Sequence, residues 1–329
     1  NLDGAAWLEG CLRSIAEGTR RPAEVIVSDD GSADASAEVA ARHGARFVTG
    51  GPRSGWSATS NRGLAAATQP WIFLLNNDVE LAPDAIEKLA RAAGEHPDAA
   101  FLSPLVRSLR DRRTIDSAGL VLYPDGAARP RWHGLAEPPE PLRDEEILLP
   151  SGAALVIRRD WLERIGGFDH DFRWYCEDLD WGLRSARMGG RGCFVPGAVV
   201  YHHFSGSFGA LSPRKARYVE RNRVTVAVRH LPPRMLLASP FWTLRRWLAL
   251  SRTVTVAAGE ERTASRARIA LAALGGLGEG VLRLPRSLRE RRVLAQIAAV
   301  DGPRLAMLLM RFQSSTADMR RFGARSSAV

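Results

Sequence analysis

The feature that most constrains the fold of this chain is an alternation of short apolar runs with helical segments along its first half. The runs at residues 24–27, 45–49 and 71–75 have the length and composition of strands that are buried on both faces. Segments whose apolar residues recur at helical spacing separate these runs. Strands that alternate with helices usually pair in parallel, so the chain is predicted to be an α/β protein with a parallel sheet.

The same reasoning gives the remaining elements. Further strands are predicted at residues 99–104, 149–158 and 193–200. Helices are predicted at residues 8–15, 33–43, 57–67, 83–94, 178–188 and 214–230. A polar, proline-rich stretch at residues 129–146 is expected to form a loop over the surface.

Basic charge is concentrated at the end of the chain. Residues 231–329 contain 17 arginines and 6 acids, a balance of +11, whereas residues 1–230 contain 29 basic and 30 acidic residues, a balance of −1. Pro232 and Pro233 separate the two parts, because proline interrupts a helix that begins before it. We therefore expect an α/β domain at residues 1–230 and an arginine-rich tail of amphipathic helices at residues 231–329.

Several protein classes are excluded by composition. The three cysteines, Cys11, Cys176 and Cys193, form no CxxC pair, which argues against a secreted disulfide scaffold and a cysteine-based zinc site. The apolar runs at residues 235–244 and 269–277 are shorter than the roughly 18 to 20 residues that a spanning helix needs. We expect a reducing compartment, no transmembrane helix and no signal peptide.

Acidic residues follow two of the predicted strands. Asp29 and Asp30 end one strand, directly before Gly31 and Ser32, and Asp78 follows another. Ligands of open parallel sheets bind beyond the carboxyl ends of the strands, so one cleft could hold all three acids, and Asp29 and Asp30 are candidates for binding the base or ribose of a nucleotide. The structural alternative for the first pair is a turn in which the acids satisfy loop backbone groups.

The segment Asn76, Asn77 and Asp78 is typical of a divalent cation site, since oxygen donors and open positions for phosphate oxygens suit Mg²⁺. An ordinary Asx turn is the structural alternative. His202 ends another predicted strand and either ligates a metal or satisfies a buried backbone group.

A third acidic segment begins a predicted helix. It contains Glu177, Asp178 and Asp180, and Trp174 and Trp181 flank it. Acids are favoured at any helix N-terminus because they interact with the helix dipole, and this is the structural alternative. Acids beside aromatic rings also suit sugar recognition, and one of them is a candidate general base.

Together these segments resemble the inverting, GT-A-type glycosyltransferases of family 2, in particular the rhamnosyltransferase-like group that builds bacterial surface polysaccharides. The resemblance covers residues 1–230 and depends on motifs in a fixed order. The motifs begin at Asn1, Leu8, Val27, Asn61, Leu75, Ser151, Gly166, Glu177, Tyr201 and Arg221.

The resemblance implies a role for each candidate residue. Asp178 would be the catalytic base, and Asp78 and His202 would bind a divalent metal, Mg²⁺ or Mn²⁺. The residues expected to bind the nucleotide sugar are Asp29, Asp30, Ser32, Asn61, Asn76 and Asn77. The residues expected to contact the acceptor or sugar are Gly152, Trp174, Glu177 and Trp181.

The implied reaction is transfer of rhamnose or a similar hexose from a nucleotide sugar to a polysaccharide or lipid-linked glycan in cell-surface glycan synthesis. Two departures from the family are expected to matter. Asn76 replaces the first acid of the family's DxD-like motif. The strand that precedes the asparagine matched by Asn1 is absent from this sequence, so we expect unpaired neighbouring strands, poor folding or weak nucleotide binding.

The basic tail suits either phosphates of a nucleic acid or anionic lipid headgroups. Trp242, Leu244, Trp247, Leu248 and Leu250 alternate with Arg245 and Arg246, as in an interfacial helix. We expect a peripheral protein on the cytoplasmic face of the bacterial inner membrane, with no nucleic-acid partner. The alternatives are a helical appendage packed on the first domain, and a non-catalytic nucleotide- or nucleic-acid-binding module acting through the tail.

Overall fold

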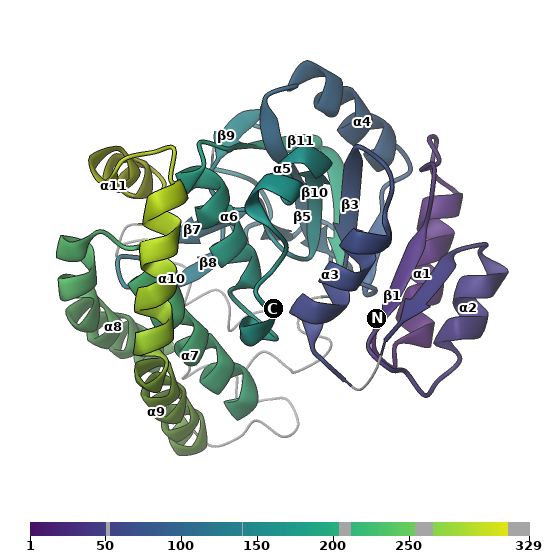
Figure 1. Ribbon diagram of the computed structural model, residues 1–329. Helices are drawn as coiled ribbons and strands as arrows, with labels where there is room; N and C mark the ends of the chain where they lie inside the picture. The colour runs from purple at the N-terminus through teal and green to yellow at the C-terminus, as the bar shows by residue number, and fades with distance from the viewer. Residues whose placement is uncertain (51–52, 140, 204–211, 254–265, 315–329) are drawn as a thin grey trace.

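The structure is a computed structural model that describes residues 1–50, 53–139, 141–203, 212–253 and 266–314. A seven-stranded sheet occupies the centre, with the strand order β3-β10-β5-β11-β4, while β6 pairs with β5 and β9 with β11. A separate pair of parallel strands, β1 and β2, lies on one side with helices α1 and α2 (Figure 1). Helices α7 to α11 gather on the opposite side (Figure 1).

The elements have the following bounds. The helices are α1 Ala5–Ala16, α2 Ser36–Arg42, α3 Trp56–Ala66, α4 Ala85–Glu95, α5 Arg159–Ile165, α6 Glu177–Arg187, α7 Pro213–His230, α8 Pro233–Thr253, α9 Arg266–Leu282, α10 Leu284–Ile297 and α11 Gly302–Arg311, with a 3₁₀ turn η1 at His170–Phe172. The strands are β1 Ile26–Asp29, β2 Arg46–Thr49, β3 Trp71–Leu75, β4 Val79–Leu81, β5 Ala99–Ser108, β6 Ile115–Ser117, β7 Leu120–Leu122, β8 Ala128–Pro130, β9 Glu145–Ile147, β10 Ala154–Arg158 and β11 Arg191–His202.

The α/β class is confirmed, but the prediction of a parallel sheet is wrong for most of the large sheet. β5 and β11 are parallel, whereas β10 is antiparallel to both β3 and β5. Strands that alternate with helices pair in parallel only where a helix connects two strands that are neighbours in the sheet. Here β10 follows a long excursion through β6 to β9 and enters the sheet between β3 and β5 in the opposite direction.

Two strand edges face each other across a gap. β1 pairs with β2 and β3 pairs with β10, and within the described residues no strand pairs with the second edge of either. Both strands line a cavity of about 1570 Å³, which includes residues 25–28 and 71–76. Unpaired edges at this position match the expectation from the sequence, and the expected effect on folding and nucleotide binding stays a prediction.

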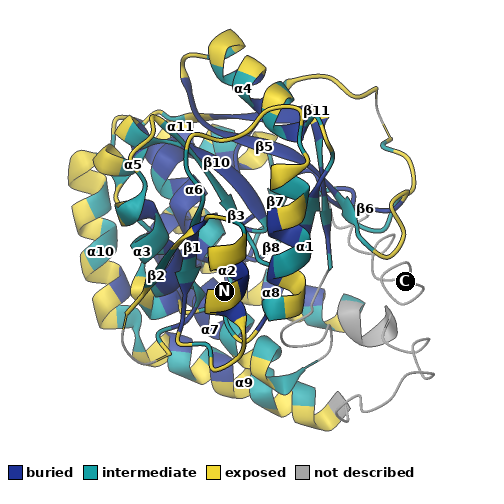
Figure 2. Ribbon diagram, turned by 90° about the vertical axis from the view of Figure 1, so that its right-hand side faces the viewer, coloured by how far each residue is buried: buried dark blue, intermediate teal, exposed yellow. Residues whose placement is uncertain are grey.

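The central strands supply the buried core. Figure 2 shows these strands in the colour of buried residues, with exposed residues on the outer faces of the surrounding helices. Phe101, Leu155, Trp181 and Phe194 are at most 1% exposed and belong to one cluster. Trp132 packs against Phe194 in the same cluster, so the stretch at residues 129–146 is not the simple surface loop that its composition predicted.

The tail helices share a core with the first part of the chain. Leu305 and Leu309 of α11 are buried in one cluster with Leu122, Leu149 and Leu179. Residues 254–265 and 315–329 of the predicted tail lie outside the described part of the chain. α8 begins at Pro233, as the diproline predicted, while the division into two domains stays a prediction.

The described residues contain no single helix that is long and apolar enough to cross a membrane. Only α10 and α11 taken together pass that test of length and composition, and they are bent by 105° relative to each other.

Candidate active site

One cavity collects most of the predicted site residues. It extends from the gap between β1 and β3 to the N-terminus of α6. Its lining includes the following candidates: Asp30, Asn76, Asn77, Asp78, Gly152, Trp174, Glu177, Asp178 and His202. Four candidates do not line it: Asp29, Ser32, Asn61 and Trp181. The sequence therefore identified the cavity, although not the role of every residue near it.

Asp178 lies in the first turn of α6 and is half-buried. Its Oδ2 atom accepts a hydrogen bond from the Gly152 amide at 2.8 Å, and its Oδ1 atom accepts one from the Leu179 amide at 2.8 Å. Burial raises the pKa of Asp178 above its usual value, and these two amide donors oppose that effect. A carboxylate that is oriented by fixed donors and more basic than usual suits a general base.

Gly152 is placed so that its backbone approaches the Asp178 carboxylate directly. A Cβ atom at this position would lie 3.2 Å from Oδ2 of Asp178, which is tighter than nine in ten real contacts of this kind. Glycine therefore lets the amide reach the carboxylate. The expected contact of Gly152 with a sugar stays a prediction.

Glu177 contrasts with its neighbour. Its side chain is buried, and its Oε2 atom has no hydrogen-bond partner among the described residues. Burial and the nearby Asp178 carboxylate raise the pKa of Glu177 well above its usual value. Burial and the neighbouring carboxylate therefore both favour the protonated form of Glu177.

The segment before α6 carries backbone strain. Arg173, Tyr175 and Cys176 have φ values of 59°, 69° and 70°, in the left-handed region that non-glycine residues seldom occupy. Asn222 of α7 holds this segment, because its Nδ2 atom lies 3.0, 2.8 and 2.7 Å from the carbonyl oxygens of residues 172, 174 and 175. The sequence analysis gave no role to Asn222.

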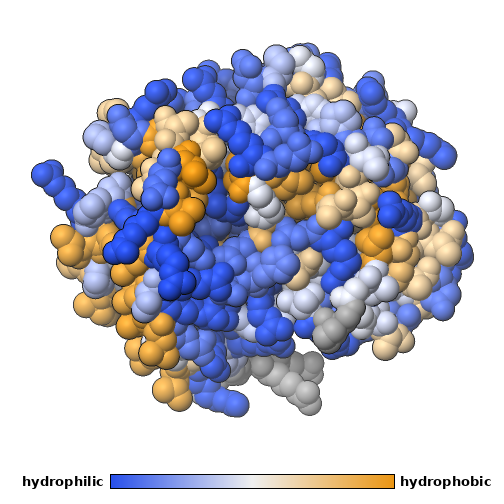
Figure 3. All heavy atoms as spheres, viewed as in Figure 1, coloured by the Kyte–Doolittle hydropathy of each residue, from blue (hydrophilic) through white to orange (hydrophobic). Residues whose placement is uncertain are grey.

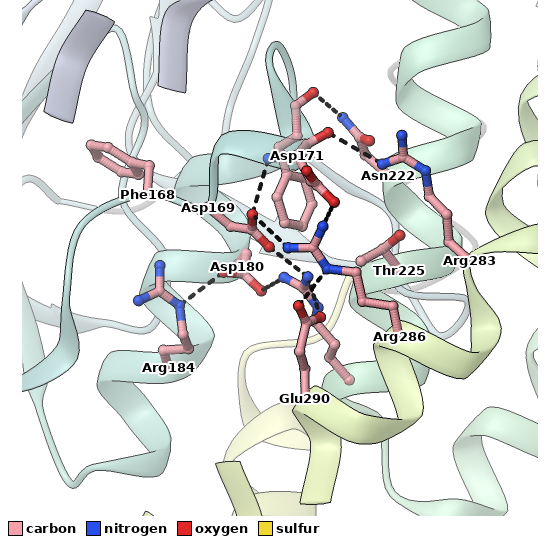
Figure 4. A network of polar contacts seen from close by, with 12 residues as sticks. Phe168, Asp169, Asp171, Asp180, Arg184, Asn222, Thr225, Arg283, Arg286 and Glu290 are labelled. Atoms are coloured by element: carbon pink, nitrogen blue, oxygen red, sulfur yellow. Dashed lines mark hydrogen bonds and ion pairs between the residues drawn. The ribbon is translucent and has the colours of Figure 1, made fainter. Parts of the chain in front are cut away.

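A buried ionic network holds the rest of α6, as Figure 4 shows. Asp180 is fully buried and accepts hydrogen bonds from Arg184 at 2.8 Å, His230 at 2.9 Å and Arg229 at 3.2 Å. Arg286 of α10 pairs with Asp171 and also approaches Asp169 (Figure 4). The helices α7 and α10 thus fix both α6 and the turn that precedes it.

Asp78 and His202 line the same cavity. His202 Nε2 is 3.4 Å from Asp78 Oδ1, and His202 Nδ1 is 2.7 Å from Asp116 Oδ2. Burial lowers the pKa of His202, but hydrogen bonds with Asp116 and Asp78 outweigh burial and raise it to about 9. Asp116 was missed by the sequence analysis, since it lies in β6, far from both partners along the chain.

The two asparagines before Asp78 connect this segment to helix α3 and to Asn1. Asn76 Oδ1 accepts a hydrogen bond from Trp56 Nε1 at 2.9 Å, and Asn77 Nδ2 donates to Asn1 Oδ1 at 2.6 Å. Asn1 Nδ2 in turn donates to Asp29 Oδ2 at 2.8 Å. Their direct contact with a nucleotide sugar stays a prediction, although both line the cavity.

The Asp29 carboxylate does not face the cavity. It accepts hydrogen bonds from Ser32 Oγ at 2.6 Å and from the amides of Ser32 and Gly31 at 2.7 and 2.9 Å. The structural alternative, an Asx turn, thus describes Asp29 and Ser32, and direct contact with a nucleotide is not supported for either. Burial would raise the pKa of Asp29, but hydrogen bonds from Ser32 and Asn1 lower it.

Asp30 does line the cavity and is also well bonded. It accepts hydrogen bonds from Ser54 Oγ at 2.7 Å and from the amides of Ser54 and Gly55 at 2.8 and 2.9 Å. Burial opposes ionisation, yet these donors lower the pKa of Asp30 below its usual value. Of the two acids that end β1, Asp30 is the one positioned to reach a ligand.

Two other predicted contacts are corrected. Trp181 is fully buried in the core and its Nε1 atom donates to the Gly166 carbonyl at 3.0 Å, so it cannot stack on a sugar. Asn61 bonds both backbone groups of Phe168, at 2.7 and 2.8 Å, and so connects α3 to the turn after α5. Trp174 remains half-buried at the cavity, beside the guanidinium of Arg214.

Basic side chains are a further feature that the sequence analysis missed. The cavity lining includes Arg53, Arg173, Arg214 and Lys215. They come from a loop, from the strained turn before α6 and from the start of α7. Positive side chains in the same cavity as Asp78 suit the diphosphate of a nucleotide sugar. No local pattern distinguishes them from the many exposed arginines of this chain.

The donor set at Asp78 fits a divalent cation. One carboxylate and one imidazole meet at the cavity wall, with asparagine residues directly before the carboxylate. This set leaves positions for phosphate oxygens, as Mg²⁺ and Mn²⁺ sites that bind nucleotides require. His202 must give up its proton before it can ligate a metal.

Comparisons with known proteins agree with this geometry. The model of glycosyl transferase family 2 matches residues 2–166. An N-acetylglucosaminyl-diphospho-decaprenol L-rhamnosyltransferase of Mycobacterium tuberculosis is 29% identical over 283 residues, which cover 79% of this chain and 92% of that protein. A pre-mycofactocin glycosyltransferase of the same species is 29% identical over 249 residues, covering 73% of this chain and 51% of that protein.

Solved structures show the same fold at low sequence identity. The Staphylococcus aureus protein TarS gives a TM-score of 0.56 with 16% identity, covering 99% of this chain and 54% of TarS. GalNAc-T7, solved with UDP, GalNAc and Mn²⁺, gives a TM-score of 0.56 with 14% identity, covering 86% of this chain and 56% of that protein. The expected GT-A fold with a helical C-terminal region is confirmed. The family match extends over half of the sequence and the fold agrees with it, so this chain belongs to glycosyl transferase family 2.

Proposed function

We propose that this chain is an inverting glycosyltransferase that moves rhamnose or a similar hexose from a nucleotide sugar to a lipid-linked or polysaccharide acceptor in cell-surface glycan synthesis. The observation that carries this proposal is the placement of Asp178 in one cavity with Asp78 and His202. The rhamnosyltransferase relative supports the donor and the lipid-linked acceptor. The alternative of a non-catalytic binding module gains no support from the relatives.

The proposed step is a single displacement at the anomeric carbon. Asp178 accepts the proton of an acceptor hydroxyl while that oxygen bonds to the anomeric carbon, whose bond to the diphosphate oxygen breaks. The Gly152 and Leu179 amides keep the carboxylate oriented during this step. A second carboxylate nucleophile is unnecessary for inversion, and the raised pKa of Glu177 makes this side chain a poor candidate for one.

We further propose that Mg²⁺ or Mn²⁺ is required, with Asp78 and His202 as its protein ligands. When bound, such an ion neutralises charge on the departing diphosphate. Arg214 and Lys215 line the same cavity, so their side chains add positive charge there besides that of the ion. This proposal is supported by the chemistry of the two side chains, because carboxylate oxygen and imidazole nitrogen are both common ligands of divalent metals.

The test is release of nucleoside diphosphate from a panel of nucleotide sugars, with a polyprenyl-diphosphate-linked amino sugar as acceptor. We expect release that needs both the acceptor and a divalent ion, and an inverted linkage in the product. Asp78→Asn should abolish metal-dependent nucleotide binding, whereas the exposed-site control Glu163→Gln should behave as wild type. Equal release after addition of a chelator would contradict the metal requirement, and a retained anomeric configuration would contradict the mechanism.

A further inference from the structure

Large apolar side chains are exposed along one side of the molecule. Figure 3 shows hydrophobic residues gathered at the left and lower left, over α8 and α9. Their exposed fractions run from 83% for Leu237 to 51% for Leu274. We call six of them the apolar flank: Leu237, Phe241, Leu244 and Leu248 of α8, and Leu271 and Leu274 of α9.

The rotation of α8 about its axis is set by the buried side of the helix. Arg246 is 7% exposed and lies 2.8 Å from Asp125 Oδ2 and 2.7 Å from Glu220 Oε1. Trp247 also donates to Glu220, at 3.1 Å. Arg246 and Trp247 were predicted to lie at an interface, but they face inward, because a buried pair of acids requires a cation beside it.

The outer side of α8 is therefore a continuous apolar stripe. Leu237, Phe241, Leu244 and Leu248 follow the spacing of residues on one face of a helix. Two of them, Leu244 and Leu248, were part of the predicted interfacial set, while Leu237 and Phe241 were not. The side chain of Leu250 lies outside the part of the chain that the structure describes.

The charge around this stripe has one sign. The sequence of α8 contains no acid, and Arg234 and Arg245 are exposed on it. The single acids of α9 and α10, Glu279 and Glu290, are both engaged in ion pairs with arginines of α7. Exposed apolar residues flanked by unbalanced arginines are typical of helices that lie in the interface of an anionic membrane.

We propose that the apolar flank docks on the surface of a bilayer containing anionic lipids, with α8 lying in the interface and not crossing it. The charge favours a lipid surface over a second copy of this chain. A symmetric contact through α8 would bring the exposed arginines of both copies together, and like charges repel across such a contact. An anionic headgroup layer instead neutralises Arg234 and Arg245 while its acyl region takes up Phe241 and Leu244.

This proposal goes beyond the proposed function and needs no donor or acceptor for its test. The 329-residue chain is mixed with phosphatidylcholine vesicles, with or without phosphatidylglycerol as the anionic lipid, and floated on a density gradient. We expect the protein to float with the anionic vesicles and much less with the neutral ones. Raising the salt concentration should weaken binding, because it screens the attraction of arginines to headgroups.

Two double variants locate the contact. Phe241→Gln with Leu244→Gln should lower the partition coefficient about tenfold or more, because both side chains lose their burial in lipid. Met307→Gln with Met310→Gln removes two similarly exposed apolar side chains from α11 and should leave binding within about twofold of wild type. Circular dichroism melting should confirm that both variants fold, as expected for exposed helix positions.

Three outcomes would overturn the proposal. In the first, the wild-type chain is recovered with neither vesicle; in the second, both double variants lose binding equally. Alternatively, sedimentation velocity without lipid shows a dimer that only the Phe241 and Leu244 variant dissociates, which would make the flank a protein interface. None of these measurements depends on the release of nucleoside diphosphate. A negative result here therefore leaves the proposed glycosyltransferase activity unaffected, and a negative result in the activity assay leaves the proposed membrane docking unaffected.

Discussion

Two pairs of adjacent acids in this chain have similar sequences and opposite environments. Asp29 and Asp30 at the end of β1 accept hydrogen bonds from neighbouring backbone and hydroxyl groups, and their pKa values are lowered. Glu177 and Asp178 at the start of α6 are less well supplied with donors, and their pKa values are raised. Asp29 and Asp30 are ionised and stabilise the loops that bond to them. In the second pair, burial makes the Asp178 carboxylate more basic, and the same burial destabilises the folded chain.

The largest expected effect is that of Asp178→Asn on turnover. Loss of a general base typically lowers the rate about 10²- to 10⁴-fold. Nucleotide binding should be unchanged, and the free energy of unfolding should stay equal or rise, because the variant removes a carboxylate that burial disfavours. Single-turnover kinetics and urea unfolding measure both effects. Turnover within threefold of wild type would remove Asp178 from its assigned role.

Asn222→Ala tests how the second pair is positioned. The variant removes three hydrogen bonds to the strained segment before α6, so the base should lose its orientation. We expect turnover to fall about 10- to 100-fold with little change in the pH at half-maximal rate. The control is Thr225→Val, one turn further along α7, whose hydroxyl bonds only its own helix. Equal losses in both variants would indicate general destabilisation of α7.

Asp30→Asn tests the first pair. The substitution replaces a charged acceptor of three hydrogen bonds by a neutral amide, and such bonds contribute about 1.5–3 kcal/mol each when one partner is charged. We expect the free energy of unfolding to fall by about 2 kcal/mol in urea titrations. Asp98→Asn at an exposed turn position is the comparison variant. No destabilisation would show that the loop at residues 54–55 is held by other contacts.

The two pairs should also separate in their response to acid. Turnover should fall as the pH drops through the raised pKa of Asp178, above the usual value of about 3.9. The stability that Asp29 and Asp30 contribute is present above that usual value and is lost only as the pH falls through their lowered pKa values. Parallel measurements of rate and intrinsic fluorescence should thus show a pH range with folded, inactive protein. Simultaneous loss of both signals would contradict this separation.

The smallest effect is expected for Glu177→Gln. The amide is uncharged, like the protonated carboxyl that burial favours at this position, so the free energy of unfolding should change by less than about 0.5 kcal/mol at pH 7. The rate should fall much less than in the Asp178 variant. A loss comparable with that of Asp178→Asn, measured in the same single-turnover assay, would reverse the assignment of the two acids.

Much of the fold follows from local sequence patterns, because period and composition are properties of short segments. The runs at residues 71–75 and 45–49 become β3 and β2, and acids that end strands do meet at one cavity. Strand direction was not predictable in the same way. β10 follows a long segment that lies between it and β5 in the sequence. Residues 154–158 contain no pattern that indicates which strands β10 will pair with or in which direction.

The sequence by itself determined the type of the longer elements, the concentration of arginine in the tail and the chemistry present at the strand ends. Only the tertiary structure decided which side chains reach the cavity. Trp181 was assigned to sugar contact but fills the core, Asp29 bonds its own turn, and Arg246 faces Glu220 across helices. Burial and partner choice depend on contacts between residues far apart in the chain, and such contacts leave no signal in the local period of hydrophobicity.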